Sequence, residues 1–178
     1  MKSILISSLC AALLSPAMVY AADGTINFTG TVVAVTCTYS APSKTQNITL
    51  PPVSVSALGS PTNTNTNANT AGDTAFTVEL GSCSTARNVA ISLEGPTFDI
   101  ATGYLKNTTT NNAAAANVQV QLVDRTNNTV LQAYANTAGV QPTGDGKAVI
   151  PLLARYVAVG TAGAGTVTSS VNFSIMYP

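Results

Sequence analysis

The feature that most constrains how this chain can fold is a period of two in its apolar residues. Seven segments either alternate apolar with polar side chains or are rich in valine and isoleucine: residues 24–37, 47–55, 75–83, 88–95, 117–124, 148–159 and 166–177. Alternation with this period gives a β-strand one buried face and one solvated face. Turn-forming runs such as DRTNN and PTGDGK lie between these segments. We therefore predict an all-β protein.

The sequence pattern does not decide the local structure of two polar stretches. Residues 60–72, SPTNTNTNANTAG, are of low complexity and form either a mobile loop or the frame of a short edge strand. Residues 111–117, NNAAAAN, are long enough for one helical turn, but asparagine and threonine crowd both ends. No segment carries the apolar stripe that is typical of an amphipathic helix.

The first residues, 1–21, have the pattern of a secretory signal peptide. Lys2 precedes an apolar run at residues 4–14, Pro16 follows that run, and cleavage is expected after Ala21. The apolar run is shorter than the roughly 20 residues of a membrane-spanning helix, and no other stretch approaches that length. We expect a mature chain, residues 22–178, that is exported without membrane insertion and forms one domain with its own core.

Removal of the signal peptide would leave two cysteines. Cys10 departs with the signal, while Cys37 and Cys83 remain, 46 positions apart, in an exported and therefore oxidising setting. We predict that these two form a disulfide, with two free buried thiols as the alternative. A metal site is disfavoured because two thiolates without a histidine do not complete a tetrahedral shell. Strands at this spacing, with a disulfide between an early and a middle strand, favour an immunoglobulin-like sandwich.

The charged residues disfavour several classes of function. Seven basic and seven acidic residues leave no basic patch for nucleic acid or anionic lipid. The chain has no histidine, the commonest general base. The acidic residues that a paired-carboxylate glycosidase would need are scattered singly: Asp73, Glu79, Glu94, Asp99, Asp124 and Asp145. We predict neither enzymatic activity nor a cofactor, and we read QVQLVDR as a central strand ending in a turn, with Asp124 and Arg125 in solvent.

The C-terminal residues raise the question of what pairs with the last strand. The sequence VNFSIMYP places Val171, Phe173, Ile175 and Tyr177 on one face of a strand, and the chain then stops. These side chains are core residues in any sandwich. A sandwich usually protects such a strand with neighbours on both sides, and the sequence supplies no obvious second neighbour.

The N-terminal residues of the mature chain form a spare strand. In DGTINFTGTVV, Ile26, Phe28, Gly30 and Val32 fall on one face. Three apolar side chains and one glycine suit a strand that packs into an apolar groove, because glycine lets two backbones approach closely. The alternative is that this segment is the first strand of its own domain, which we expect only for residues 33–37.

Several segments, taken together, resemble subunits of chaperone–usher fimbriae, closest to the type 1 major pilin family. They are GTINFTGTVVAVTC, VELGSC around the second cysteine, VQVQLVDRTN, IPLLARYVAVG and the C-terminal residues 165–177. Their order, the cysteine spacing, Gly165 and the penultimate Tyr177 carry the resemblance through the whole mature chain. The Asn- and Thr-rich residues 60–70 depart from it.

This resemblance implies an incomplete immunoglobulin-like β-sandwich that lacks its final strand and is completed by a donor strand from another subunit. Residues 22–32 would form the N-terminal donor-strand extension and residues 33–178 the pilin domain. The acceptor groove and the chaperone-binding C-terminal strand would include Gly165, Val171, Phe173, Ile175, Tyr177 and Pro178. The implied partners are a periplasmic chaperone, an outer-membrane usher and other fimbrial subunits, and the implied location is a cell-surface fimbrium reached through the periplasm.

The implied function is that of a structural subunit that polymerises by donor-strand exchange into an adhesive surface fibre. Three alternatives stay open. A minor adaptor or tip-associated subunit would share the same pattern. A tip adhesin usually carries an additional N-terminal lectin domain, for which this chain has no room. A monomeric secreted β-sandwich that binds a ligand would have a self-complete fold.

Overall fold

The computed structural model describes residues 27, 29–30, 32, 37–40, 44–59, 69–110 and 112–178. The chain divides into two compact units, Met1–Ala34 and Val35–Pro178. The expected signal peptide, residues 1–21, lies outside the described residues. The larger unit contains all of the helices and strands that are described.

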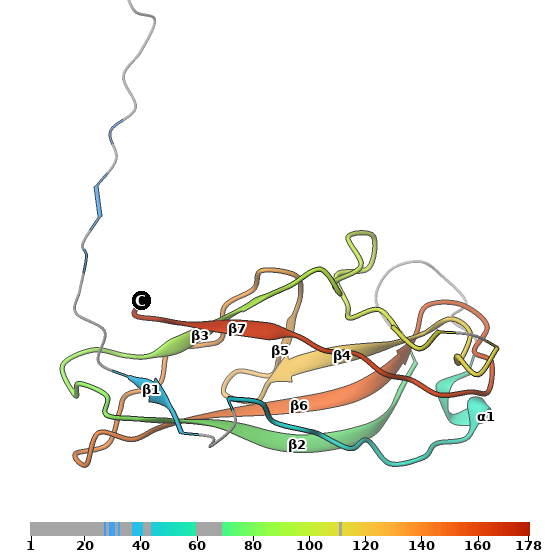
Figure 1. The fold of residues 1–178 in the computed structure, drawn as a ribbon, viewed down its shortest axis with the longest axis horizontal. Helices are drawn as coiled ribbons and strands as arrows, with labels where there is room; N and C mark the ends of the chain where they lie inside the picture. The colour runs from blue at the N-terminus through green and yellow to red at the C-terminus, as the bar shows by residue number, and fades with distance from the viewer. Residues whose placement is uncertain are drawn as a thin grey trace, which may run out of the picture. The chain divides into compact units, whose positions relative to one another are not determined.

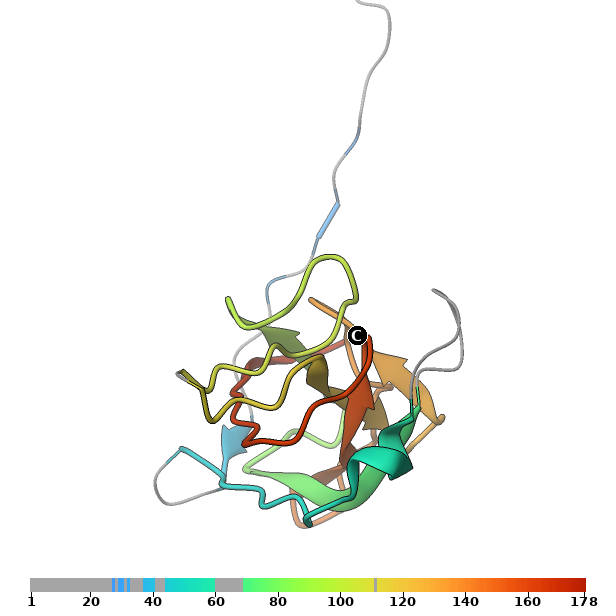
Figure 2. The same cartoon turned by 90° about the vertical axis from the view of Figure 1, so that its right-hand side faces the viewer.

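This larger unit is a two-layered β-sandwich. Its described strands and single short helix are β1 (Thr38–Tyr39), α1 (Val55–Leu58), β2 (Thr70–Gly81), β3 (Ala90–Glu94), β4 (Val118–Asp124), β5 (Thr129–Leu131), β6 (Ala148–Ala158) and β7 (Asn172–Met176). One sheet has the order β1-β2-β6-β4-β5, and the other pairs β3 with β7. Figure 1 shows β3 and β7 running above β2 and β6, and Figure 2 shows the same unit from its end. The prediction of an all-β, immunoglobulin-like sandwich is confirmed.

The core lies between the two layers because alternate residues of the long strands point inward. The β2–β6 register places Val78 opposite Ile150 and Leu80 opposite Ala148. All four side chains are buried, and they pack with Ile91 and other residues of the smaller sheet in one cluster. The period-two pattern of the sequence is therefore realised as a packed inner face.

The disulfide Cys37–Cys83 connects the start of β1 to the end of β2, with 4.1 Å between the two Cα atoms. Both cysteines are buried. The Cys83 N–H also donates to the Gly146 carbonyl at 2.8 Å, which holds the turn that precedes β6. The first strand is thus attached covalently to the large sheet.

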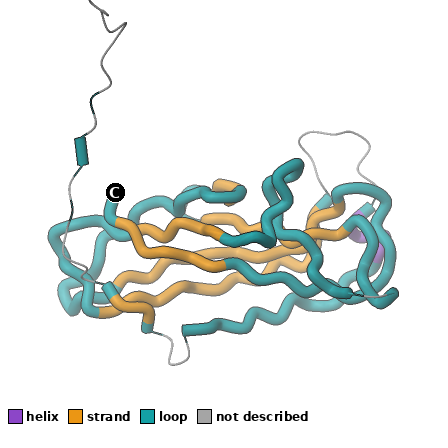
Figure 3. The backbone as a smooth tube through the Cα atoms, turned by 45° about the horizontal axis from the view of Figure 1, so that its top comes forward, coloured by secondary structure: helices purple, strands orange, loops and turns teal. Residues whose placement is uncertain are grey.

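The strand expected at residues 47–55 is not formed. Its residues run without strand pairing, and α1 begins at Val55 (Figure 3). Pro51 and Pro52 lie in the middle of the segment and have no N–H to donate to a ladder. Ser54 then caps the helix, because its hydroxyl accepts a hydrogen bond from the Ala57 N–H at 3.2 Å.

Smaller differences concern the ends of other segments. Thr70–Gly72, the end of the low-complexity stretch, belongs to β2, whereas residues 60–68 lie outside the described part of the chain. Residues 112–117 contain no helix. The last strand covers Asn172–Met176 rather than residues 166–177, because Thr166 hydrogen-bonds to Ala113 and Ala115 instead of to a β3 residue.

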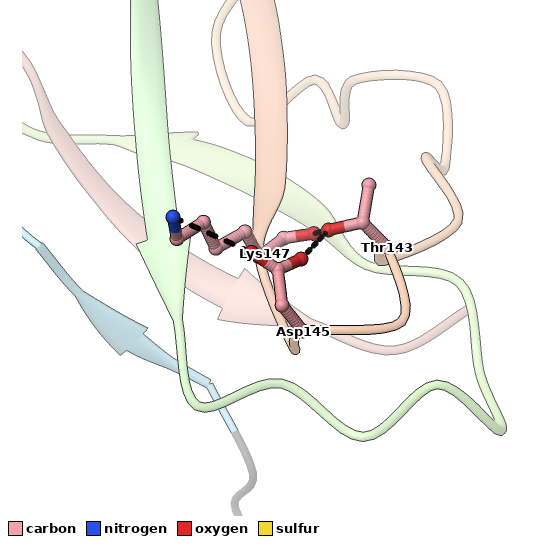
Figure 4. A network of polar contacts seen from close by, with 3 residues as sticks. All are labelled: Thr143, Asp145 and Lys147. Atoms are coloured by element: carbon pink, nitrogen blue, oxygen red, sulfur yellow. Dashed lines mark hydrogen bonds and ion pairs between the residues drawn. The ribbon is translucent and has the colours of Figure 1, made fainter.

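The turn that leads into β6 is held by a polar network, shown in Figure 4. Thr143 donates its hydroxyl to the Asp145 carboxylate and its backbone N–H to the Lys147 carbonyl at 2.8 Å. Lys147 Nζ lies 3.3 Å from Asp145 Oδ2. The hydrogen bond from Thr143, and after it the one from Lys147, lowers the pKa of Asp145. This network stabilises the turn that the sequence PTGDGK predicts.

Asp124 corrects the prediction that this carboxylate lies in solvent. The residue is fully buried at the end of β4, while Arg125 is exposed. Its two carboxylate oxygens accept from the Thr126 N–H at 2.8 Å and the Ala138 N–H at 2.6 Å. Ala138 belongs to residues 135–140, which run beside β3. Asp124 therefore connects β4 of the large sheet to residues 135–140, which hydrogen-bond to β3 of the small sheet.

We predict that Asp124→Asn destabilises the fold by about 1–3 kcal/mol, because an amide group would turn a donor toward one of the two N–H groups and leave it unsatisfied. Urea unfolding of the mature chain measures this change. Glu79→Gln, which alters an exposed carboxylate on β2, serves as the control and should change stability by less than about 0.5 kcal/mol. Equal midpoints for both variants would show that the Asp124 contacts contribute nothing.

Candidate functional site: the open edge of strand β7

The two strands of the small sheet differ in their number of neighbours. β3 pairs with β7 from Ala90↔Met176 to Glu94↔Asn172. On its other side, β3 hydrogen-bonds to residues 135–140, which the sheet assignment leaves outside the named strands. Within the described residues no strand pairs with the second side of β7. β7 is therefore an edge strand, although it lies over the core.

The register shows which backbone groups face this open edge. Ile91 accepts from the Thr137 N–H at 2.9 Å and donates its own N–H to the Thr137 hydroxyl at 3.0 Å, so both groups point away from β7. In an antiparallel pair, its partner Ile175 must then direct its N–H and C=O away from β3. The same reasoning applies to Leu93, which donates to Ala135, and its partner Phe173.

These outward backbone groups of Phe173 and Ile175 have no hydrogen-bond partner in the described part of the chain. A row of free N–H and C=O groups is a template for another strand. Natural edge strands are commonly protected by charges, proline or short length. β7 carries no charged residue.

The side chains along this edge are apolar and only half-buried. Val171, Phe173, Ile175 and Tyr177 all pack against the core cluster but remain partly exposed. This is the same set that the sequence pattern placed on one strand face. We call this row, together with the free backbone groups beside it, the β7 edge.

The first strand faces the C-terminal end of the β7 edge. Ser40 donates its N–H to the Glu79 carbonyl of β2, so the alternate residues Cys37 and Tyr39 direct their backbone groups away from β2. The Cys37 N–H donates to the Tyr177 hydroxyl at 2.9 Å. The Tyr39 and Phe173 rings meet edge to face, with centroids 5.1 Å apart. Side chains, rather than ladder hydrogen bonds, therefore make these contacts between β1 and the last strand.

A cavity of about 170 Å³ lies beside the segment that leads into β7. Most of the residues that line it are apolar: Pro52, Val53, Val55, Leu58, Ala115, Val118, Tyr156, Gly163, Ala164, Gly165 and Val167. Val167 also packs against the main core cluster that the β7 edge covers. The site thus has side-chain contacts to β1 at one end and a hollow near the other.

Gly165 lies where this segment crosses residues 113–115 at close range. Its φ is +156°, and a Cβ atom there would lie 2.4 Å from the Ala115 nitrogen and 2.6 Å from the Ala113 oxygen. Thr166, the next residue, exchanges hydrogen bonds with Ala113 and Ala115. Only glycine fits this crossing without moving the backbone that lines the cavity.

We predict that Gly165→Ala destabilises the mature chain by roughly 1–3 kcal/mol, because the methyl group overlaps backbone atoms that cannot move independently. Urea unfolding measures the change. Gly144→Ala is the matched control, since a Cβ atom there would meet nothing within 4 Å. If both variants unfold at the same urea concentration, the close crossing at Gly165 is not a constraint on the fold.

The predicted donor residues fall mostly outside what can be described. Ile26 and Phe28 lie outside the described residues. Val32 is fully exposed, and a Cβ atom at Gly30 would meet nothing within 4 Å. Both belong to the smaller unit, Met1–Ala34. The assignment of Ile26, Phe28, Gly30 and Val32 to a donor strand therefore stays a prediction.

Sequence reasoning missed one contributor to the site, Tyr39, whose ring contacts that of Phe173. Tyr39 is partly buried and packs against the core cluster. The strand expected at residues 24–37 stopped at Cys37, although continuing its alternation by one step reaches Tyr39.

Several of the described acidic side chains take part in local structure. Asp99 accepts hydrogen bonds from the Gln119 side chain at 2.7 Å and the Ala101 N–H at 3.0 Å, and these two bonds lower its pKa. Glu94 accepts from the Ser174 hydroxyl across the β3–β7 pair. Among the described residues no three acidic, histidine or cysteine side chains gather as metal ligands would. No helix in that part of the chain has the length and apolarity to cross a membrane.

Comparisons with known proteins agree on one kind of protein. The family model described as fimbrial protein matches residues 26–178. The major fimbrial subunit SMF-1 of Stenotrophomonas maltophilia is 42% identical over 173 residues, which cover 92% of this chain and 97% of that protein. The solved antigen and type I fimbria protein of Burkholderia pseudomallei is 26% identical, with a TM-score of 0.55, over 86% of this chain and 97% of that one. The P pilus rod subunit PapA, 15% identical, shares the fold with a TM-score of 0.59 over 81% of this chain and 100% of that one.

Proposed function

This chain belongs to the fimbrial protein family and is a structural subunit of a pilus, and on that premise we propose that it polymerises by donor-strand exchange. In this proposal the extension of one copy, residues 22–32, adds as a strand to the β7 edge of the next copy. The observation that carries it is the orientation of the Phe173 and Ile175 backbone groups toward an edge at which no described strand pairs.

The chemistry of the two surfaces supports the pairing. A donor backbone would supply the hydrogen bonds that the edge lacks, and an unpaired backbone group beside a core is costly. Burial of Ile26, Phe28 and Val32 would contribute roughly 1.5–3 kcal/mol for each side chain. Gly30 permits close approach of the two backbones. The cavity near Val167, which is lined mostly by apolar residues, offers space for one of these donor side chains.

We propose that a periplasmic chaperone covers the β7 edge before assembly. The subunit would reach it after export and removal of residues 1–21, and an outer-membrane usher would then direct its incorporation into a cell-surface fimbrium. Tyr177 and the terminal carboxylate of Pro178 would engage the chaperone. Pro178 is exposed and so is available for such a contact.

Within the fibre, we propose the role of a major rod subunit. The relative with 42% identity is named a major fimbrial subunit, which favours this role over that of a minor adaptor. With both a donor extension and an acceptor edge, one chain can be preceded and followed by further copies of itself. Seven basic and seven acidic residues give little net charge to oppose this packing.

The experiment that tests donor-strand exchange supplies the missing strand within one chain. Residues 23–35 are appended after Pro178 through a flexible Gly/Ser linker, and the original N-terminal copy is removed. We predict a monomeric protein that stays soluble without a chaperone and unfolds at a much higher denaturant concentration than the unfused domain, because the appended strand fills the edge.

A single substitution in the appended strand is the control. Phe28→Asp should remove most of the gain, because a carboxylate would enter an apolar groove without a partner. Chemical denaturation and sedimentation measure stability and oligomeric state together. If the unfused domain is equally stable and monomeric without a chaperone, the sandwich is complete by itself and the proposal fails.

A further inference from the structure

The hydrogen bond between Tyr177 and Cys37 joins the two functional ends of the pilin domain. The Tyr177 hydroxyl accepts from the Cys37 N–H at 2.9 Å, across 140 positions of sequence. Tyr177 follows β7 directly, so its position depends on the strand that presents the open edge. Figure 1 shows β1 and the C-terminus at the same end of the sandwich.

Cys37 requires a partner from this direction. It is buried, with 2% of its surface exposed, and a buried backbone N–H is almost always hydrogen-bonded. The pairing of β1 turns this N–H away from β2, so the large sheet cannot supply an acceptor. The Tyr177 hydroxyl oxygen therefore accepts the hydrogen bond that a carbonyl of a neighbouring strand would otherwise accept.

Cys37 is also the first described residue after the proposed donor extension, residues 22–32. Its side chain is fixed to Cys83 by the disulfide, and its backbone is fixed to β7 by Tyr177. The disulfide holds the side chain whether or not the β7 edge is filled. The hydrogen bond, in contrast, depends on how firmly β7 holds Tyr177.

We infer that the Tyr177 hydroxyl is a positioning group that couples the acceptor edge of a subunit to the base of its own donor extension. This inference rests on the proposed function. A donor strand that pairs with Phe173 and Ile175 immobilises the end of β7 and with it Tyr177. Tyr177 in turn holds the Cys37 backbone. The Cys37 backbone is therefore more rigid in a subunit whose β7 edge is filled by a donor strand than in a subunit whose edge is empty.

The test uses amide hydrogen exchange, measured by NMR, in the mature chain, residues 22–178. Phe28→Asp is included in every sample so that the chain's own extension does not compete, and a synthetic peptide of residues 23–35 is the probe. Tyr177→Phe removes only the hydroxyl. Tyr134→Phe removes a hydroxyl from an exposed tyrosine and is the matched control. Exchange at the fully buried Val89 and Ile150 reports global stability.

Without peptide, Tyr177→Phe should speed exchange at the Cys37 amide by roughly five- to tenfold, the effect of one net hydrogen bond, while Val89 and Ile150 change much less. With peptide, Phe173 and Ile175 should become protected in all three proteins. The Cys37 amide should slow further in the parent and in Tyr134→Phe, but not in Tyr177→Phe.

Equal Cys37 exchange in parent and Tyr177→Phe would overturn the coupling, and so would equal slowing of Cys37 by peptide in both. Failure of the proposed function gives a different result, in which the peptide protects neither Phe173 nor Ile175 in any sample. A uniform acceleration at Cys37, Val89 and Ile150 would show that the hydroxyl acts on global stability only, which also contradicts the coupling.

Discussion

Among the described residues, strand β7 lies over the core with a neighbouring strand on one side only, and the rest of the site follows from this constraint. Its register with β3 turns the Phe173 and Ile175 backbone groups toward the open side. The inward alternation of the same strand leaves a row of apolar side chains half-buried. Backbone groups that no described strand pairs with, beside a row of half-buried apolar side chains, are together suited to the addition of another strand.

The surroundings of β7 differ along its length. At the C-terminal end, the Tyr177 hydroxyl and the Phe173 ring reach β1, which the disulfide ties to the large sheet. Near the other end, Gly165 lets its segment cross residues 113–115 closely, beside a cavity lined mostly by apolar residues. On the side of β3 away from β7, the buried Asp124 holds the residues that hydrogen-bond to β3. The β7 edge thus lies between two fixed parts of the fold, the disulfide-linked β1 and the Gly165 crossing.

Much of this architecture could be predicted from local pattern, because period-two alternation depends only on neighbouring residues. Strands β2, β3, β4 and β6 lie within or overlap the predicted segments. The prediction of a strand at residues 47–55 was wrong because it followed the apolar residues of this segment, whereas Pro51 and Pro52 cannot donate to a ladder. The prediction for Asp124 was wrong because a residue beside a turn is expected to be exposed to solvent. Its burial depends instead on a contact with Ala138, fourteen positions away. Pairing partners such as Cys37 and Tyr177 are set by topology, which alternation does not encode.

The most direct test of the account is a high-resolution cryo-EM structure of the fibre that this chain builds. The account predicts a strand hydrogen-bonded to Phe173 and Ile175 in every subunit, with its backbone traceable into Cys37 of the neighbouring subunit. Gly30 and Val32 should lie in that strand. An edge left empty in the fibre, or filled by the extension of the same subunit, would contradict the claim that β7 is the acceptor for another copy.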